Sequence, residues 1–149
     1  MRRGLLHFAF VKLQLEENNS GKLKIITQYG KQPQDDILLT NLPEKGYEVW
    51  KEAVLYGLKY AYSKLKNNTG LTINVEAVLG SHADTNATLL AYAAFMAVIS
   101  KKEHCLTENH LSDIEVMAFS SFNYFHDSMP DFDECVIKRI KPQSRYRIN

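Results

Sequence analysis

The sequence lacks the features that hold secreted proteins together or place proteins in a membrane. It contains only two cysteines, Cys105 and Cys135, and no apolar run near the ~20 residues that a membrane span needs. Arg2 and Arg3 precede an apolar stretch, but this stretch ends at Lys12 without a small-residue cleavage site. We therefore expect reduced thiols, a cytoplasmic location and no membrane partner.

The chain also lacks a strong excess of one charge. Its 18 Lys and Arg and 17 Asp and Glu give a formal net charge of +1, which argues against a polyanion binder that uses its whole surface. With 149 residues, of which 45% are hydrophobic and 23% charged, it has the size and composition of one globular domain. We expect residues 1–149 to form a single α/β sandwich domain with a loosely held basic tail at 141–149.

Two segments have the periodicity of helices packed on a sheet. From Trp50 to Leu65, apolar residues recur at helical spacing with charged residues between them. Gly57 lies on this apolar stripe, where it lets the helix approach the sheet closely. The second segment follows the loop at 80–86 and runs to about Lys101. Because it is apolar almost all round, we expect it to be buried in the domain or against a partner chain.

Alternating or continuous apolar runs predict the strands. The clearest is Leu71–Leu79, while Leu5–Leu15 is apolar on both faces, as in a central strand, and 22–29 alternates like its antiparallel partner. The remaining expectations are short strands at 37–39, 114–122 and 135–140, a polar connection at 103–113 with or without a short turn of helix, and a loop or short helix at 127–134. The predicted order is β-β-β-α-β-α-β, an α+β fold with two helices packed on one face of a mixed sheet.

The stretch from Gly46 to Ser100 resembles domain IV of elongation factor G, in the ribosomal protein S5 domain 2-like superfamily. The resemblance covers about a third of the chain: a helix, an alternating strand, a Gly-Ser loop with His and Asp, and an Ala-rich helix. The matching residues are Gly80, Ser81, His82 and Asp84, followed by Leu90–Ala97. It implies a two-layer sandwich and contact with the ribosome or structured RNA. The sequence has no Gly-x-x-x-x-Gly-Lys-Ser/Thr phosphate loop, so it cannot itself drive translocation.

Two segments are candidate anion or RNA contacts. The loop residues that we single out are Gly80, Ser81, His82, Asp84, Thr85 and Asn86. Free amides at a helix start can hold an anion, whereas the alternative is a turn glycine, a surface histidine and an N-cap supplied by Asp84, Thr85 or Asn86. The tail residues are Lys138, Arg139, Lys141, Arg145 and Arg147, typical of a phosphate-contacting arm and equally of a solvated terminus.

We expect no metal site and no cofactor. His104, Cys105, His110 and Asp113 are metal-capable residue types, but no pair has a recognised ligand spacing. The acidic stretch that includes Asp131, Asp133 and Glu134 has the composition of a solvated loop, with cation binding as the alternative. Its carboxylates would raise the pKa of Cys135, so we reject a cysteine nucleophile.

Three functions remain open, and we assign no catalytic residues. The first is a translation-related or RNA-contacting accessory domain. The second is a non-enzymatic interaction module, such as a homodimer that uses the apolar second helix or an open sheet edge. The third, ranked last because no catalytic partner is evident, is a small enzyme with His82 as acid or base.

Overall fold

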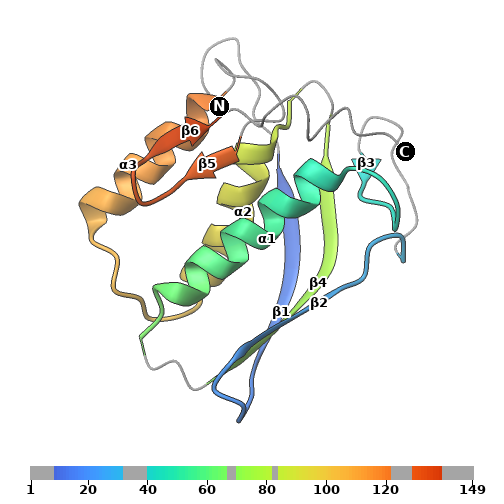
Figure 1. Ribbon diagram of the computed structural model, residues 1–149, viewed down its shortest axis with the longest axis horizontal. Helices are drawn as coiled ribbons and strands as arrows, with labels where there is room; N and C mark the ends of the chain where they lie inside the picture. Colours follow the sequence, from blue (N-terminus) through green and yellow to red (C-terminus); the bar gives the residue numbers. More distant parts are fainter. Residues whose placement is uncertain (1–8, 32–39, 67–69, 82–83, 122–128, 139–149) are drawn as a thin grey trace.

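The protein is an α+β domain in which helices cover one face of a mixed sheet (Figure 1). The computed structural model describes residues 9–31, 40–66, 70–81, 84–121 and 129–138. Along the chain the elements are β1 (Phe10–Glu17), β2 (Leu23–Thr27), β3 (Thr40–Asn41), α1 (Glu48–Ser63), β4 (Leu71–Gly80), α2 (Ala87–Ile99), α3 (Glu108–Phe119), β5 (Met129–Asp131) and β6 (Val136–Lys138).

Strand β4 lies at the centre of the sheet. It pairs antiparallel with β1 on one side, and on the other side it pairs parallel with β2 and antiparallel with β3. The prediction that the first strand is central and pairs with 22–29 is therefore wrong. The chain passes from β2 through β3 and α1 to β4, and a long connection that includes a helix is what joins parallel neighbours. The expected strand at 37–39 lies outside the described residues.

The alternation along β4 separates a covered face from an open one. Ile73 and Val75 are fully buried under the helices, whereas Thr72 and Asn74 point to the other face and are half-buried. The pairing of β1 with β4 shifts between Lys12 and Leu13. Because this bulge resets the alternation, Val78 again points toward the helices and is fully buried.

Helices α1 and α2 were expected from the sequence, and both are confirmed. The expected role of Gly57 needs correction, because this glycine faces α2 and not the sheet. A Cβ added at Gly57 would overlap the carbonyl of Ala91 and lie 3.1 Å from the backbone N of Phe95. The close approach that Gly57 allows is therefore between the two helices.

The region after α2 differs from the sequence-based expectation. Instead of a polar connection and a strand at 114–122, it forms α3, which begins where the Thr107 side chain accepts a hydrogen bond from His110 N at 3.1 Å. Ile114, Met117 and Ala118 are its buried residues, and this is helical spacing. Strand β5 lies inside 127–134, which was expected to be a loop or short helix. The expected strand at 135–140 is confirmed for the three residues of β6.

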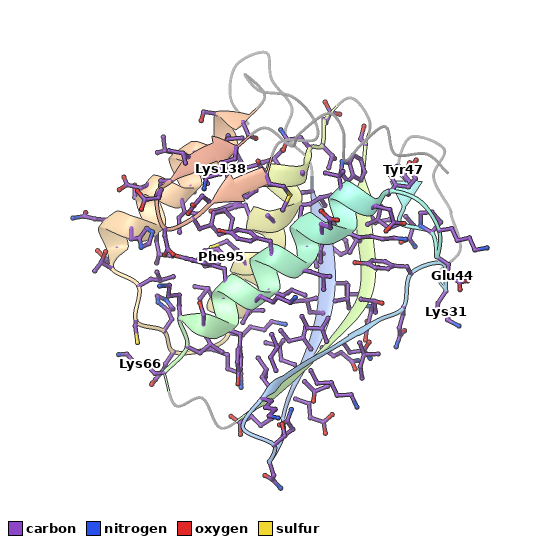
Figure 2. The ribbon with its side chains drawn as sticks, in the orientation of Figure 1. Lys31, Glu44, Tyr47, Lys66, Phe95 and Lys138 are labelled. Atoms are coloured by element: carbon purple, nitrogen blue, oxygen red, sulfur yellow. The ribbon has the colours of Figure 1, made fainter. Side chains whose placement is uncertain are left out.

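Strands β5 and β6 pair antiparallel as a hairpin. This hairpin and α3 lie on the opposite side of α2 from the sheet (Figure 1). The buried core is one cluster that extends from the sheet past α1 and α2 to α3 and the hairpin. Phe95 of α2, labelled in Figure 2, belongs to this cluster. Within the described ranges, no helix is both long and apolar enough to cross a membrane.

We predict that Gly57→Ala destabilises the fold. In an isolated helix, alanine is more favourable than glycine by about 1 kcal/mol. Here, however, the methyl group of alanine meets the backbone of Ala91, which cannot move without shifting α2. Overpacking of this kind costs roughly 1–3 kcal/mol, so we expect a lower urea midpoint. The matched control is Lys59→Ala, an exposed position on the same helix, which should change little. An unchanged or higher midpoint for Gly57→Ala would contradict the close helix contact.

Candidate functional site

The loop that follows β4 is held by its own side chains. The backbone N–H of Ser81 donates to Thr85 Oγ1 at 2.8 Å, and Thr85 N–H donates back to Ser81 O at 2.8 Å. Asn86 is the N-cap of α2, since its Oδ1 accepts from Leu89 N–H at 2.8 Å. A Cβ on Gly80 would lie 2.7 Å from the ring of Trp50, so only glycine fits there.

The same loop is anchored to the end of α3. Asn86 Nδ2 donates to Ser121 Oγ at 3.0 Å, and Ser121 Oγ donates to Ala118 O at 2.6 Å. Thr85 is fully buried and Asn86 is 2% exposed, so neither side chain is available to a ligand. An anion or RNA contact at this loop stays a prediction for Ser81 and Asp84, which are half-buried, while His82 lies outside the described residues.

The other predicted candidates are dispersed. Lys138, at the end of β6, pairs with Asp131 at 3.2 Å. Arg139, Lys141, Arg145 and Arg147 lie outside the described residues. Of the histidines near Cys105, His104 accepts from Leu106 N–H at 3.2 Å and His110 contacts the hairpin. In the described part of the chain, no group of three or more metal-capable side chains converges.

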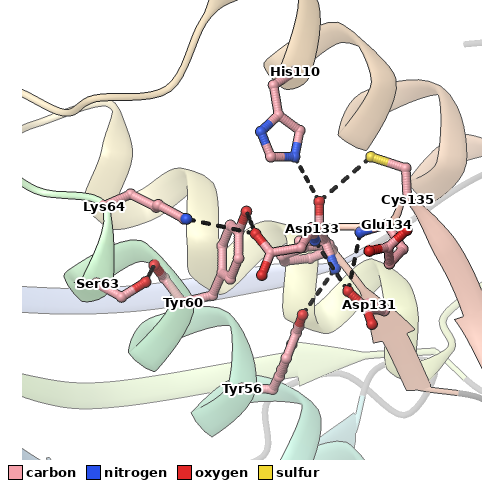
Figure 3. A network of polar contacts seen from close by, with 10 residues as sticks. Tyr56, Tyr60, Ser63, Lys64, His110, Asp131, Asp133, Glu134 and Cys135 are labelled. Atoms are coloured by element: carbon pink, nitrogen blue, oxygen red, sulfur yellow. Dashed lines mark hydrogen bonds and ion pairs between the residues drawn. The ribbon is translucent and has the colours of Figure 1, made fainter.

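The structure brings together a network that the sequence did not reveal, centred on the buried Phe132 (Figure 3). Its backbone N–H donates to Tyr56 Oη at 2.8 Å, and its carbonyl accepts from His110 Nε2 at 2.7 Å and from Cys135 Sγ at 3.4 Å. Its ring centroid lies 5.2 Å from those of Tyr56 and Phe95. The turn between β5 and β6 is thus held by side chains of α1, α2 and α3.

A charged pair holds the same turn to α1. Tyr60 Oη donates to Asp133 Oδ1 at 2.7 Å, and Lys64 Nζ lies 3.5 Å from the same oxygen (Figure 3). Burial, then the hydrogen bond to Asp133, raises the pKa of Tyr60 above its usual value. This hydroxyl therefore stays protonated at neutral pH and serves as a donor, which is a structural role.

The turn itself is built on Asp131. Its Oδ1 accepts from the backbone N–H groups of Asp133 and Glu134, each at 3.1 Å. The hydrogen bond from Glu134 N–H is the largest cause that lowers the pKa of Asp131, followed by Lys138. Burial and then nearby carboxylates, Asp113 first, raise the pKa of the Cys135 thiol, which is the direction expected from its acidic neighbours in the sequence.

A second buried hydroxyl lies near the start of α1. Tyr29 Oη is buried and has no hydrogen-bond partner in the described part of the chain. Burial, and then the charge of Glu48, raises the pKa of Tyr29 to about 12. Lys51 Nζ lies 5.0 Å from the centroid of this ring and donates to Glu44 O at 2.8 Å. At neutral pH this hydroxyl is neither a base nor a nucleophile.

The open face of the sheet contains a hollow of about 480 Å³. Gln14, Asn74 and Ile26 form one row across β1, β4 and β2, and Glu16, Thr72 and Lys24 form the next. Asn74 Oδ1 is buried there and has no hydrogen-bond partner among the described residues. Such an acceptor is costly unless a ligand or water supplies a donor. Sequence reasoning missed this face because it depends on which strands are neighbours.

Two exposed apolar side chains and two exposed lysines lie on the same face, and of these Ile26 lines the hollow. On the same face Phe10 is 45% and Ile26 40% exposed, and both belong to the few large hydrophobic side chains that the structure leaves open. Lys12 and Lys24 are exposed, and Lys101 lines the hollow from the end of α2. Among the described residues, the carboxylates of Glu16 and Glu76 also lie on this face. Glu76 pairs with Lys12 at 3.4 Å.

Most of the apolar helix α2 is buried by α1, β1, α3 and β5. Tyr92, Ala93, Met96 and Ala97 are half-buried, and none of the helix residues is exposed. The expectation that the helix is buried on most sides within the domain is therefore confirmed, and its use in a homodimer stays a prediction. An open sheet edge stays a prediction.

We predict that Tyr56→Phe loosens the hairpin. The substitution leaves the backbone N–H of Phe132 without its acceptor in a part-buried place, and an unsatisfied group of this kind costs about 1–3 kcal/mol. The measurement is the urea midpoint. Tyr92→Phe is the matched control, because the Tyr92 hydroxyl donates no hydrogen bond among the described residues. Equal midpoints for the two variants would show that the network does not hold the turn.

A pH-dependent effect is expected at Asp131. Its folded-state pKa lies below the ordinary value of 3.8, so the carboxylate stabilises the turn at neutral pH and loses this effect as the pH falls through the folded pKa. Asp131→Asn should therefore be less stable than the parent at neutral pH, and the difference should shrink in acid. Thermal melts of both proteins, recorded from neutral pH down to below the folded-state pKa of Asp131, measure this difference in stability. Glu52→Gln, at an exposed position of α1, should show no such convergence.

Comparison with known proteins adds no relative. No family model, no curated protein and no solved structure matches this chain.

Proposed function

We propose that this chain is a non-enzymatic binding domain that contacts structured RNA with the open face of its sheet. The observation that carries the proposal is the hollow on the open face, which is lined by polar side chains such as Gln14 and Asn74 together with Ile26. Amide side chains of this kind can hydrogen-bond RNA base edges and 2′-hydroxyl groups. The resemblance to elongation factor G domain IV supports the choice of RNA as the ligand.

The surroundings of the hollow fit unpaired RNA bases. Sheet faces that bind RNA stack splayed-out bases on exposed aromatic rings, and Phe10 is 45% exposed on this face. Lys12, Lys24 and Lys101 are placed to meet phosphates around it. The carboxylate of Glu16 on the same face disfavours a long phosphate backbone across the centre. A short loop of unpaired nucleotides is therefore the expected ligand.

An enzymatic role has less support among the described side chains. The chemically capable groups are engaged in holding the fold: His110 donates to a carbonyl, Tyr60 is hydrogen-bonded to Asp133, and the pKa of Cys135 is raised. A binding role needs only the exposed polar and aromatic groups of the sheet.

The test is binding of an RNA stem-loop, measured by fluorescence anisotropy over a range of salt concentrations. We expect salt-sensitive binding to the stem-loop and weaker binding to the duplex of the same stem. The triple variant Lys12→Ala, Lys24→Ala and Lys101→Ala should lower the slope of log affinity against log salt by roughly 2, since each lost phosphate contact removes about 0.7. Phe10→Ser should weaken binding by roughly 1–3 kcal/mol if a base stacks on the ring.

The control carries the same change of charge elsewhere. Lys45→Ala, Lys59→Ala and Lys66→Ala remove three exposed lysines at or next to α1. Their effect on the salt slope should be small. No salt-sensitive binding, or an equal loss with both triple variants, would remove the sheet face as the RNA contact.

A further inference from the structure

A second surface, distinct from the sheet, lies between α3 and β6. It is a groove of about 390 Å³, at the small end of the range for protein pockets, roughly 300–1,000 Å³. Its apolar side chains come from both elements, and the residues that matter here are Val116, Met117, Val136, Ile137, Asp113 and Cys135.

The groove is bordered by two apolar side chains that the domain leaves in solvent. Val116 is 55% exposed and Val136 is 45% exposed. They lie on different elements and line the same hollow. The other large apolar side chains that the described residues expose, Phe10 and Ile26, lie on the sheet. Two exposed valines on either side of a groove can bury an apolar side chain of a partner.

The segment that forms this groove has a charge unlike the rest of the chain. Between Glu103 and Ile137 there is no Lys or Arg, and all 18 basic residues lie outside it. Its acidic residues are Glu103, Glu108, Asp113, Glu115, Asp127, Asp131, Asp133 and Glu134. The overall net charge of +1 conceals this separation, which the sequence contains and a residue-by-residue inspection of motifs overlooks.

Within the described part of this segment, most carboxylates have no described Lys or Arg within 4.0 Å. Asp131 pairs with Lys138 and Asp133 with Lys64, both within the hairpin network. In the described ranges no Lys or Arg lies within 4.0 Å of Asp113 or Glu134. Asp113 lines the groove itself, and the exposed Glu134 directly precedes Cys135, which also lines it. A negative potential therefore surrounds an apolar hollow.

We infer that this groove docks a basic, amphipathic segment of a partner protein. An apolar side chain of that segment fills the space between Val116 and Val136, and its flanking Lys or Arg residues meet Asp113 and Glu134. A polyanion is repelled here, and a purely apolar segment leaves the carboxylates unpaired. Complementary charge raises the association rate and selects the partner, while the apolar contact supplies the binding energy.

This inference is independent of the proposed RNA contact. Helix α3 and the hairpin lie across α2 from the sheet (Figure 1). Variants in the groove are therefore expected to leave RNA binding unchanged, and variants of the sheet face to leave the groove unchanged. Failure of one proposal can be distinguished from failure of the other.

The probe is a short fluorescein-labelled peptide in which leucines are flanked by lysines and arginines. We expect full-length protein to bind it, and to bind less well when serine replaces the leucines. Val116→Ser should weaken binding about fivefold, and Asp113→Lys about tenfold at low salt. Both positions are exposed, so the variants should keep the thermal stability of the parent.

The controls place the same changes elsewhere. Ile26→Ser removes an exposed apolar side chain of the sheet, and Glu52→Lys reverses an exposed charge on α1. Neither should alter peptide affinity by as much as twofold. Equal losses with the groove variants and these controls, or equal affinity for the leucine and serine peptides, would overturn the inference.

The two cysteines provide a second measurement that uses the unmodified chain. Cys135 lines the groove and is half-buried, whereas Cys105 is exposed and does not line it. Saturating peptide should slow iodoacetamide labelling of Cys135 several-fold and leave Cys105 unchanged, as read by mass spectrometry. Equal labelling of Cys135 with and without peptide would overturn the inference. Tighter peptide binding by Arg145→Glu with Arg147→Glu would also do so, because the chain's own basic tail would then be the occupant.

Discussion

The burial of most of α2 is the constraint on which the rest of the structure depends. Apolar side chains surround this helix, and leaving them in water would cost far more than the small net stability of a domain of this size. Burial on most sides requires several covering elements. The sheet covers one side, α1 approaches closely at Gly57, and α3 and β5 pack on further sides.

This arrangement explains why the hairpin is fixed so firmly. Two strands of three residues each are too short to be stable alone. Their turn inserts Phe132 among the rings of Tyr56, Tyr60 and Phe95, and its backbone groups are satisfied by side chains of α1 and α3. The polar groups most reminiscent of an active site are therefore the ones that complete the core.

Covering α2 also separates two kinds of surface. The sheet keeps a free face with lysines, amides and an exposed Phe10, and the opposite side of the molecule carries the acidic segment with Val116 and Val136. Opposite charge on two sides of one small domain suits a protein that connects two partners. The RNA contact and the protein-docking groove that we propose would leave each other's surface free.

The sequence by itself determined the elements whose pattern is local. The spacing of apolar residues located α1 and α2, the alternation located β4, and Asn86 was among three candidates for the cap of α2. Strand neighbours, the helical state of 108–119 and the burial of Phe132 were decided only by the tertiary structure. Each depends on side chains distant along the chain: β1 and β2 meet only through β4, and Phe132 is held by Tyr56 and Phe95. A periodic pattern indicates which face of a segment is buried, but packing over the whole domain determines which element covers that face.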